Sequence, residues 1–234
     1  MRTSEEVFSG SNFDYDAIVI GAGISGLYQL YRLRESGVRV CALESGTGVG
    51  GTWYWNRYPG ARFDSESYSY AYSFSQELLD EWDWSEHFSS QPEILSYLQY
   101  VADKFDLLKD IQFSSNVRSA IYDEDSRRWQ VEIEDGNIYR TRFLITALGV
   151  LSEPTLPKIK GMESFGGRSF HTARWPHEPV DFHGRRVAVI GTGASGVQTI
   201  QEIAKDVGHL TVFQRRPNWC APLNNGKIKA DEMR

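Results

Sequence analysis

The chain has 234 residues, of which 41% are hydrophobic and 24% are charged. These proportions are those of a soluble globular protein and argue against a disordered, collagen-like or coiled-coil chain. A formal net charge of −6 disfavours broad electrostatic binding to nucleic acid or to an anionic membrane. The length predicts one large domain or two modest ones.

The cysteines and the N-terminal residues limit the kinds of site and compartment. Neither Cys41 nor Cys220 belongs to a CxxC motif or a Cys/His cluster, so we predict no metal site. Residues 1–10 are polar and acidic, and no apolar run reaches the roughly 18 residues of a membrane helix. We therefore expect a cytoplasmic protein that binds neither nucleic acid nor membrane, with its oligomeric state left open.

The ordered chain is expected to begin with a βαβ unit. Residues 16–20, DAIVI, have the apolar, β-branched pattern of a strand buried on both faces. The glycine loop GAGISG follows at 21–26, and helical spacing runs from it to about residue 37. A second strand over 38–43 ends at Glu44. Such a unit joins two parallel strands by a right-handed crossover helix.

The middle of the chain is less regular. Residues 46–91 are rich in glycine, serine and aromatic residues, and we predict an irregular segment there. A helix is predicted from Pro92 to about Phe105. With Asp135-Gly136 as a hairpin turn, a β-meander is predicted from the short apolar segments at 111–113, 117–122, 129–133 and 139–145.

The first architecture is repeated about 170 residues further on. After a proline-bearing linker at 152–157, a strand is predicted at 186–190 and the loop GTGASG follows at 191–196. A helical run to about residue 207 and a strand at 210–213 complete the repeat. The fold class predicted is therefore α/β, with two Rossmann-like dinucleotide-binding units, each three-layered on a mostly parallel sheet, and an inserted β-meander.

Both glycine loops have the form GxGxxG, which is weak alone but specific between a strand and a helix. The first glycine permits the tight turn, the second lets the backbone approach a pyrophosphate, and the third allows the helix to pack closely on the strand. The helix N-terminus adds N–H donors and a favourable dipole. An ordinary glycine-rich turn is the alternative, and the strand, loop, helix and strand order disfavours it.

The residues that end the second strands distinguish the two loops. Glu44 stands 23 positions after Gly21, where a carboxylate accepts hydrogen bonds from a ribose diol and repels a 2′-phosphate. Arg215 and Arg216 stand 24 and 25 positions after Gly191, where guanidinium groups suit a 2′-phosphate. A solvated surface pair is the alternative for the arginines. The first loop therefore predicts FAD or NAD and the second predicts NADPH.

Two further motifs resemble a known family. Residues 165–176, FGGRSFHTARWP, resemble the FxGxxxHxxxWP fingerprint of type I Baeyer–Villiger monooxygenases, and they precede the second glycine loop as in that family. Residues 50–64, GGTWYWNRYPGARFD, are similar to its flavin-site segment. The resemblance runs from about Tyr15 to Pro217. The flavin-containing N- and S-oxygenating monooxygenases are similar but lack the Trp-Pro ending.

The resemblance implies an FAD- and NADPH-dependent monooxygenase. Such an enzyme inserts one atom of O2 next to the carbonyl of a ketone through a flavin C4a-peroxide and forms an ester or lactone. The domains implied are a flexible tail at 1–13, the N-terminal part of an FAD-binding domain at 14–150 and the N-terminal part of an NADPH-binding domain at 151–234. The family's catalytic arginine falls beyond Arg234, so the isolated chain is expected not to convert ketones.

The catalytic candidates are Asp64 and His171. By resemblance, Asp64 lies near the nicotinamide with Arg62 and partners the catalytic arginine, while His171 couples cofactor binding to domain movement. From the residues alone, a turn residue and a structural histidine are the alternatives. The predicted cofactor-binding residues are Gly21, Gly23, Ser25, Gly26, Glu44, Gly51, Thr52, Trp53, Trp55, Arg62, Asp64, Tyr70, Val117, Gly191, Gly193, Ser195, Gly196, Gln198, Arg215 and Arg216.

Two other functions remain open at this stage. One is a flavin-containing N- or S-oxygenating monooxygenase. The other is a non-catalytic dinucleotide-binding fragment, which the absence of the family's C-terminal segments favours. Trp82 and Trp84 are interpreted as packing residues, because they lie further from the Gly-Gly pair than Trp53 and Trp55.

Overall fold

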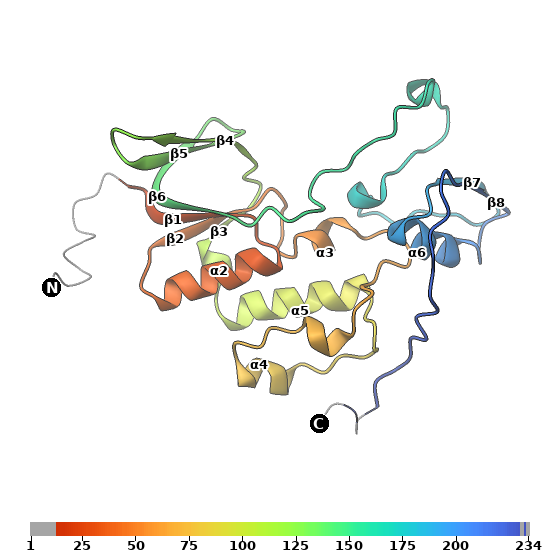
Figure 1. Ribbon diagram of the computed structural model, residues 1–234, viewed down its shortest axis with the longest axis horizontal. Coiled ribbons are helices and arrows are strands. Elements are labelled where there is room, and N and C mark those ends of the chain that lie inside the picture. The colour runs from red at the N-terminus through yellow and green to blue at the C-terminus, as the bar shows by residue number, and fades with distance from the viewer. Residues whose placement is uncertain (1–12, 230–231, 233–234) are drawn as a thin grey trace. The chain divides into compact units, whose positions relative to one another are not determined.

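The computed structural model describes residues 13–229 and Glu232 (Figure 1). All of the tail predicted at 1–13 except Phe13 lies outside the described residues. The chain forms two compact units. The first unit contains the residues up to Gly51 and Leu98–Gly149, and the second contains Thr52–Tyr97 and the residues from Val150 onward. Residues 52–97 therefore group with the second unit, and the cofactor assignment of the domains at 14–150 and 151–234 stays a prediction.

The first unit is built on one six-stranded sheet. Its strands in spatial order are β3 (Ile111–Gln112), β2 (Val40–Leu43), β1 (Tyr15–Ile20), β6 (Ile138–Thr146), β5 (Arg128–Ile133) and β4 (Val117–Asp123). The four strands from β3 to β6 are parallel, and β6, β5 and β4 are antiparallel. The predicted α/β class with a mostly parallel sheet is confirmed for this unit.

The first βαβ unit forms as predicted. Strands β1 and β2 pair in parallel register, and α2 (Ile24–Glu35) connects them and packs against both. Strand β2 begins two residues later than expected, because Val38 N–H still donates to Leu33 of the helix and the Arg39 side chain is held by Asp16. The chain leaves the helix end and joins the sheet at residue 40.

The β-meander supplies a third layer. Val131 and Ile133 of β5 share a buried cluster with Ile18 of β1 and with Cys41 and Leu43 of β2. Among the strands of the described residues, β5 is hydrogen-bonded only to β4 and β6, so the sheet must curl to bring the apolar face of β5 over the parallel strands. Figure 1 shows β4 and β5 on the side of β1 and β2 opposite α2.

The assignment of one strand to the meander was wrong. The segment at 111–113 forms β3, which pairs in parallel with β2 at the other edge of the sheet. Alternation of apolar residues identifies a strand but not its partner, and α5 (Gln91–Lys104), found where a helix was predicted, returns the chain to that edge. The expected irregular segment at 46–91 also contains short helices, at Thr52–Trp55 (α3), Ser67–Tyr70 and Gln76–Glu81 (α4).

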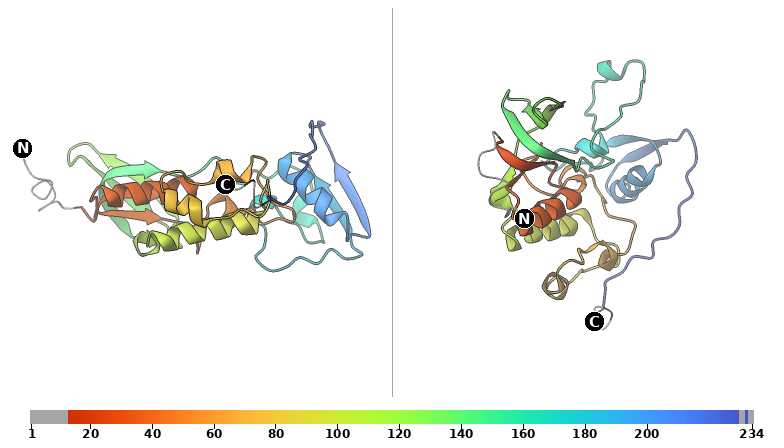
Figure 2. Two further views of the ribbon diagram at one scale, coloured as in Figure 1. Left: turned by 90° about the horizontal axis from the view of Figure 1, so that it is seen from below. Right: turned by 60° about the vertical axis from the view of Figure 1, so that its left-hand side comes forward.

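The second unit contains the repeated motif. Strands β7 (Arg186–Ile190) and β8 (His209–Phe213) pair in parallel, and α6 (Ala194–Ile203) connects them (Figure 2). The helix ends four residues before the predicted residue 207, because Val207 forms a bridge with His183 and Gly208 N–H donates to Arg185. Single 3-10 turns lie at Met162–Ser164 and Thr172–Arg174. Within the described residues, no helix has the length and apolarity to span a membrane.

Candidate functional site

The first glycine loop has a backbone that only glycine fits. Gly21 has φ of 103°, and a Cβ there would lie 2.7 Å from the carbonyl oxygen of Ala147. A Cβ on Gly26 would lie 1.9 Å from the carbonyl oxygen of Gly21. The turn from β1 into α2 is therefore as tight as the sequence predicted, with the helix pressed against the loop.

The second glycine of this loop, Gly23, packs against the Gly50-Gly51 pair that begins the flavin-site segment. A Cβ on Gly51 would lie 2.8 Å from Gly23 Cα, and Gly50 N–H donates to Ala22 O at 3.0 Å. Gly23 is also the N-cap of α2, which has no side-chain cap and no acidic residue in its first turn. Two backbones thus form a cradle at a helix N-terminus, which fits a pyrophosphate. Ser25 is exposed in that first turn.

Glu44 is buried at the end of β2 with 4% of its surface exposed. Its Oε2 accepts from Ala22 N–H at 2.7 Å and its Oε1 accepts from Gly46 N–H at 2.7 Å. Oε1 also accepts from the Ser45 hydroxyl at 3.3 Å, so Oε2 is the oxygen that retains a lone pair for a ribose hydroxyl. The carboxylate therefore holds the glycine loop in place as well as standing where a ribose diol is expected.

Replacing Glu44 by alanine should lower the free energy of unfolding even without a cofactor. The buried N–H groups of Ala22 and Gly46 would lose their acceptor, which we expect to cost about 2–3 kcal/mol. Urea unfolding of the chain without FAD measures this, with exposed Glu124→Ala as the control. A change in Glu44→Ala no larger than in the control would mean that the carboxylate does not support the loop.

The flavin-site segment contributes an aromatic cluster to the second unit. Trp53 is 8% exposed, and its Nε1 donates to the hydroxyl of Tyr70 at 3.0 Å. The rings of Phe63 and Tyr70 stack with centroids 4.5 Å apart, and Trp84 packs edge-on against Phe63. Trp53 and Tyr70 were predicted to line FAD, and here they contact each other. Their contact with FAD stays a prediction.

Asp64 and Arg62 differ in their surroundings. Arg62 Nη1 lies 3.1 Å from Glu86 Oε2 and donates to Phe88 O at 3.1 Å. Asp64 is exposed, and among the described residues no hydrogen bond or ion pair is formed by its carboxylate. The predicted approach of both residues to the nicotinamide remains untested, and the bonds from Arg62 to Glu86 and Phe88 both use Nη1.

The fingerprint motif contacts the flavin-site segment through Arg174. Its guanidinium lies 4.7 Å from the ring centroid of Trp55, and its Nη2 donates to Ser152 O at 2.7 Å. His171 Nδ1 accepts from Ala173 N–H at 3.1 Å and caps the 3-10 turn that carries Arg174. In this structure His171 therefore has the capping role of a structural histidine. Its predicted part in domain movement remains a prediction.

The second glycine loop is more open than the first. Gly191 has φ of 104°, and a Cβ on Gly196 would lie 2.5 Å from the carbonyl oxygen of Gly191. A Cβ on Gly193 would have no atom within 4 Å. Ile190 pairs with Phe213 at the ends of β7 and β8. The glycine loop follows Ile190 and the two arginines follow Phe213, so Arg215 and Arg216 leave the sheet at the same strand ends as the loop. Both arginines are exposed, as a phosphate-binding pair requires.

Other predicted residues lie at the margins of these features. Thr52 begins α3, and Thr52 O accepts from Asn56 N–H. Val117 begins β4 and packs against the core of the first unit. Ser195 is in the first turn of α6. Gln198, one turn further on, bonds Tyr58 and Arg62. Tyr58 was not among the predicted site residues. Its place in the sequence directly before Pro59-Gly60 was the signal that could have identified it.

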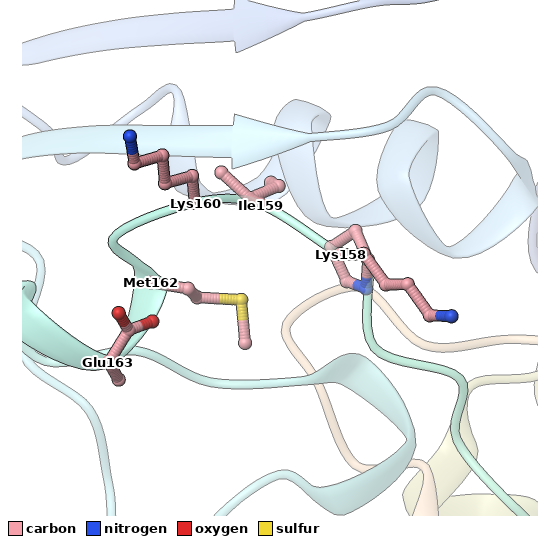
Figure 3. Close-up of a pocket in the computed structure, with 6 residues that line it drawn as sticks. Lys158, Ile159, Lys160, Met162 and Glu163 are labelled. Atoms are coloured by element: carbon pink, nitrogen blue, oxygen red, sulfur yellow. The ribbon is translucent and has the colours of Figure 1, made fainter.

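A hollow of about 500 Å³ is lined by none of these residues. It is lined by Pro157, Lys158, Ile159, Lys160, Met162 and Glu163. Figure 3 shows its two lysine side chains pointing in opposite directions. A ligand site has polar groups that converge, so this hollow carries no functional assignment. Among residues 13–229 and Glu232, no group of three metal-ligating side chains occurs.

Comparisons with known proteins agree with the motifs. The family described as "Flavin-binding monooxygenase-like" matches residues 16–225. Acetone monooxygenase (methyl acetate-forming) of Gordonia sp. (strain TY-5) is 51% identical over 218 residues, which cover 93% of this chain and 41% of that protein. A phenazine N-monooxygenase of Lysobacter antibioticus is 46% identical over 215 residues, covering 92% and 40%.

A solved structure of OTEMO in complex with FAD and NADP superposes with a TM-score of 0.91 at 48% identity. The match covers 95% of this chain and 43% of that chain. This chain therefore spans about two fifths of the length of the relatives that it matches.

Proposed function

Because this chain belongs to the flavin-binding monooxygenase-like family, we propose that it carries the FAD-binding and NADPH-binding motifs of a Baeyer–Villiger type monooxygenase. The observation that carries the proposal is the pair of glycine loops, each placed between a strand and a helix, with different residues at the ends of their second strands. Glu44 follows the first pair of strands, and Arg215 and Arg216 follow the second.

FAD is assigned to the first loop. The backbone around Gly23 and Gly51 would hold the pyrophosphate at the N-terminus of α2, and the Glu44 carboxylate would accept from the ribose hydroxyls. A 2′-phosphate would be repelled by the same carboxylate. The solved structure of OTEMO contains FAD and NADP, which supports one site for each cofactor. We assign residues 14–150 to the FAD-binding domain on this basis.

NADPH is assigned to the second loop, within residues 151–234. The loop from Gly191 to Gly196 would face the pyrophosphate, and Arg215 and Arg216 would bind the 2′-phosphate. The open space at Gly193 leaves room for the cofactor backbone. A flavoprotein that is reduced by NADPH requires one dinucleotide site that disfavours a 2′-phosphate and one that binds it.

Bound FAD would supply the redox chemistry, namely hydride acceptance from NADPH and activation of O2. The residues of this chain position and stabilise. Asp64 has a free carboxylate that can hold a cation beside the reacting atoms and so stabilise anionic charge. We assign His171 a supporting role, because it caps the turn that places Arg174 on the ring of Trp55.

A ketone is the substrate class that we propose, with O2 as co-substrate and an ester or lactone as product. The Trp175-Pro176 ending of the fingerprint and the acetone monooxygenase relative both favour it. Heteroatom oxygenation is the alternative, because a phenazine N-monooxygenase matches the chain at 46% identity.

The proposal predicts that NADPH bleaches the visible flavin absorption of the FAD-loaded protein under anaerobic conditions, and that NADH does so more slowly. For oxygen transfer, a longer chain that includes the family's catalytic arginine is incubated in air with acyclic ketones, cyclic ketones and a phenazine, and the products are identified by mass. Esters or lactones support the proposed reaction, whereas N-oxides alone would support the alternative. A protein that retains no FAD after gel filtration would contradict both.

A further inference from the structure

The side chain of Gln198 holds the flavin-site segment against helix α6, within the second unit. Its Oε1 accepts from the Tyr58 hydroxyl at 2.8 Å and from Arg62 N–H at 3.4 Å. Its Nε2 donates to Arg62 O at 3.0 Å. The carboxamide therefore pairs with the backbone of Arg62 through both ends, as a neighbouring strand would, and both lone pairs of Oε1 are used.

The surrounding contacts fix this arrangement. Gly60 has φ of 78°, and a Cβ there would lie 2.7 Å from the carbonyl oxygen of Gln198. The segment thus approaches the helix backbone more closely than any other residue would allow. Burial raises the pKa of the Tyr58 phenol, the Ser195 hydroxyl lowers it and the Asp64 carboxylate raises it. The phenol is therefore protonated at neutral pH and able to donate to Gln198.

These contacts change the role expected for Gln198. It stands one turn after Ala194, the first residue of the helix that follows the second glycine loop, and the sequence predicted a cofactor contact. A carboxamide whose acceptor oxygen is saturated by Tyr58 and Arg62 is poorly placed to bind a cofactor as well. The bonds lead instead to the segment that carries Asp64.

We propose that Gln198 is a positioning residue that ties residues 58–64, and with them Asp64, to the helix that receives the NADPH pyrophosphate. Binding at the glycine loop then stabilises the surface on which the Asp64 segment lies. The coupling is reciprocal, so an ordered segment also raises the affinity for the dinucleotide by the same factor. This inference rests on the assignment of NADPH to the second loop.

Hydrogen exchange of the amides at 58–64, measured with and without NADP⁺, tests the proposal. In Gln198→Leu without cofactor, we expect exchange at 58–64 to be faster by roughly tenfold, because the bonds to Tyr58 and Arg62 are lost. NADP⁺ should still bind, with less than a tenfold loss of affinity, but should no longer slow exchange at 58–64. In the unmodified protein NADP⁺ should slow it.

Two further variants separate this role from a general loss of stability. Tyr58→Phe removes one of the bonds and should give a smaller effect that is not additive with Gln198→Leu. Gln201→Leu makes the same substitution on the same helix at an exposed position and should change neither exchange nor affinity.

The remaining outcomes overturn the proposal. If Gln198→Leu loses NADP⁺ affinity by a hundredfold while exchange at 58–64 is unchanged, Gln198 is a cofactor ligand. If NADP⁺ binds the unmodified protein without slowing exchange at 58–64, the two are not coupled. If NADP⁺ does not bind at all, the assignment of the second loop fails, and unchanged exchange in cofactor-free Gln198→Leu would separately rule out the tie itself.

Discussion

Substitution of Gly23 by valine is expected to abolish FAD binding. A Cβ on Gly23 would already lie 3.3 Å from Gly51 Cα, and valine adds two methyl groups in the space where a pyrophosphate would approach the N-terminus of α2. Losing two or more charge-assisted hydrogen bonds from backbone N–H groups should weaken binding by about a hundredfold or more. Flavin absorbance retained after gel filtration and a flavin fluorescence titration measure the effect.

The equivalent glycine of the second loop provides the matched control. A Cβ on Gly193 would have no atom within 4 Å, so Gly193→Val should leave the fold and FAD affinity intact while weakening NADPH. Circular dichroism establishes that both variants are folded. A folded Gly23→Val protein with unchanged FAD affinity would show that FAD is bound elsewhere.

The two βαβ units could be predicted because their signals are local. Each strand of 16–20 and 186–190 is a short apolar run, and each glycine loop dictates its own turn through contacts within a few residues. The Gly26 to Gly21 contact is of this kind, since both residues lie in one loop. Spacing alone therefore placed both loops at helix N-termini, as the structure confirms.

The features that the sequence did not reveal depend on contacts between distant residues. The partner of β3 is set by the path of α5 and not by any pattern within 111–113. The second role of Glu44, as an acceptor for Ala22 N–H, joins residues 22 positions apart. Gln198 and Tyr58 are 140 positions apart, and no periodicity relates them. Spacing arguments predict what a loop can bind but not which side chains hold it.

The aromatic residues of the flavin-site segment illustrate the same limit. Trp82 and Trp84 were correctly interpreted as packing residues, because they contact the ring of Tyr97. Composition could not show that Trp53 packs in the same way, with its indole N–H bonded to Tyr70. That bond leaves the predicted contact of Trp53 with FAD untested.

Removal of both arginines after β8 should convert the dinucleotide preference of the second loop. In the double variant Arg215→Ala/Arg216→Ala, NADPH affinity should fall about ten- to a hundredfold, because a charge-assisted contact to the 2′-phosphate is worth roughly 1.5–3 kcal/mol. NADH has no 2′-phosphate, so its affinity should change little. Titrations of both cofactors, followed by the fluorescence of the reduced nicotinamide, give the two affinities.

The chain offers a control with the same change in charge. Arg185 and Arg186 are also adjacent, but they lie at the start of β7, whereas Arg215 and Arg216 follow the opposite end of the sheet, where Ile190 leads into the glycine loop. Arg185→Ala/Arg186→Ala should therefore leave the ratio of NADPH to NADH affinity unchanged. The NADPH affinity lost in the Arg215 and Arg216 variant should also shrink at high salt, since counterions screen exposed charges. If both double variants lower NADPH and NADH affinity equally, the arginines after β8 act through the stability of the unit and do not read the 2′-phosphate.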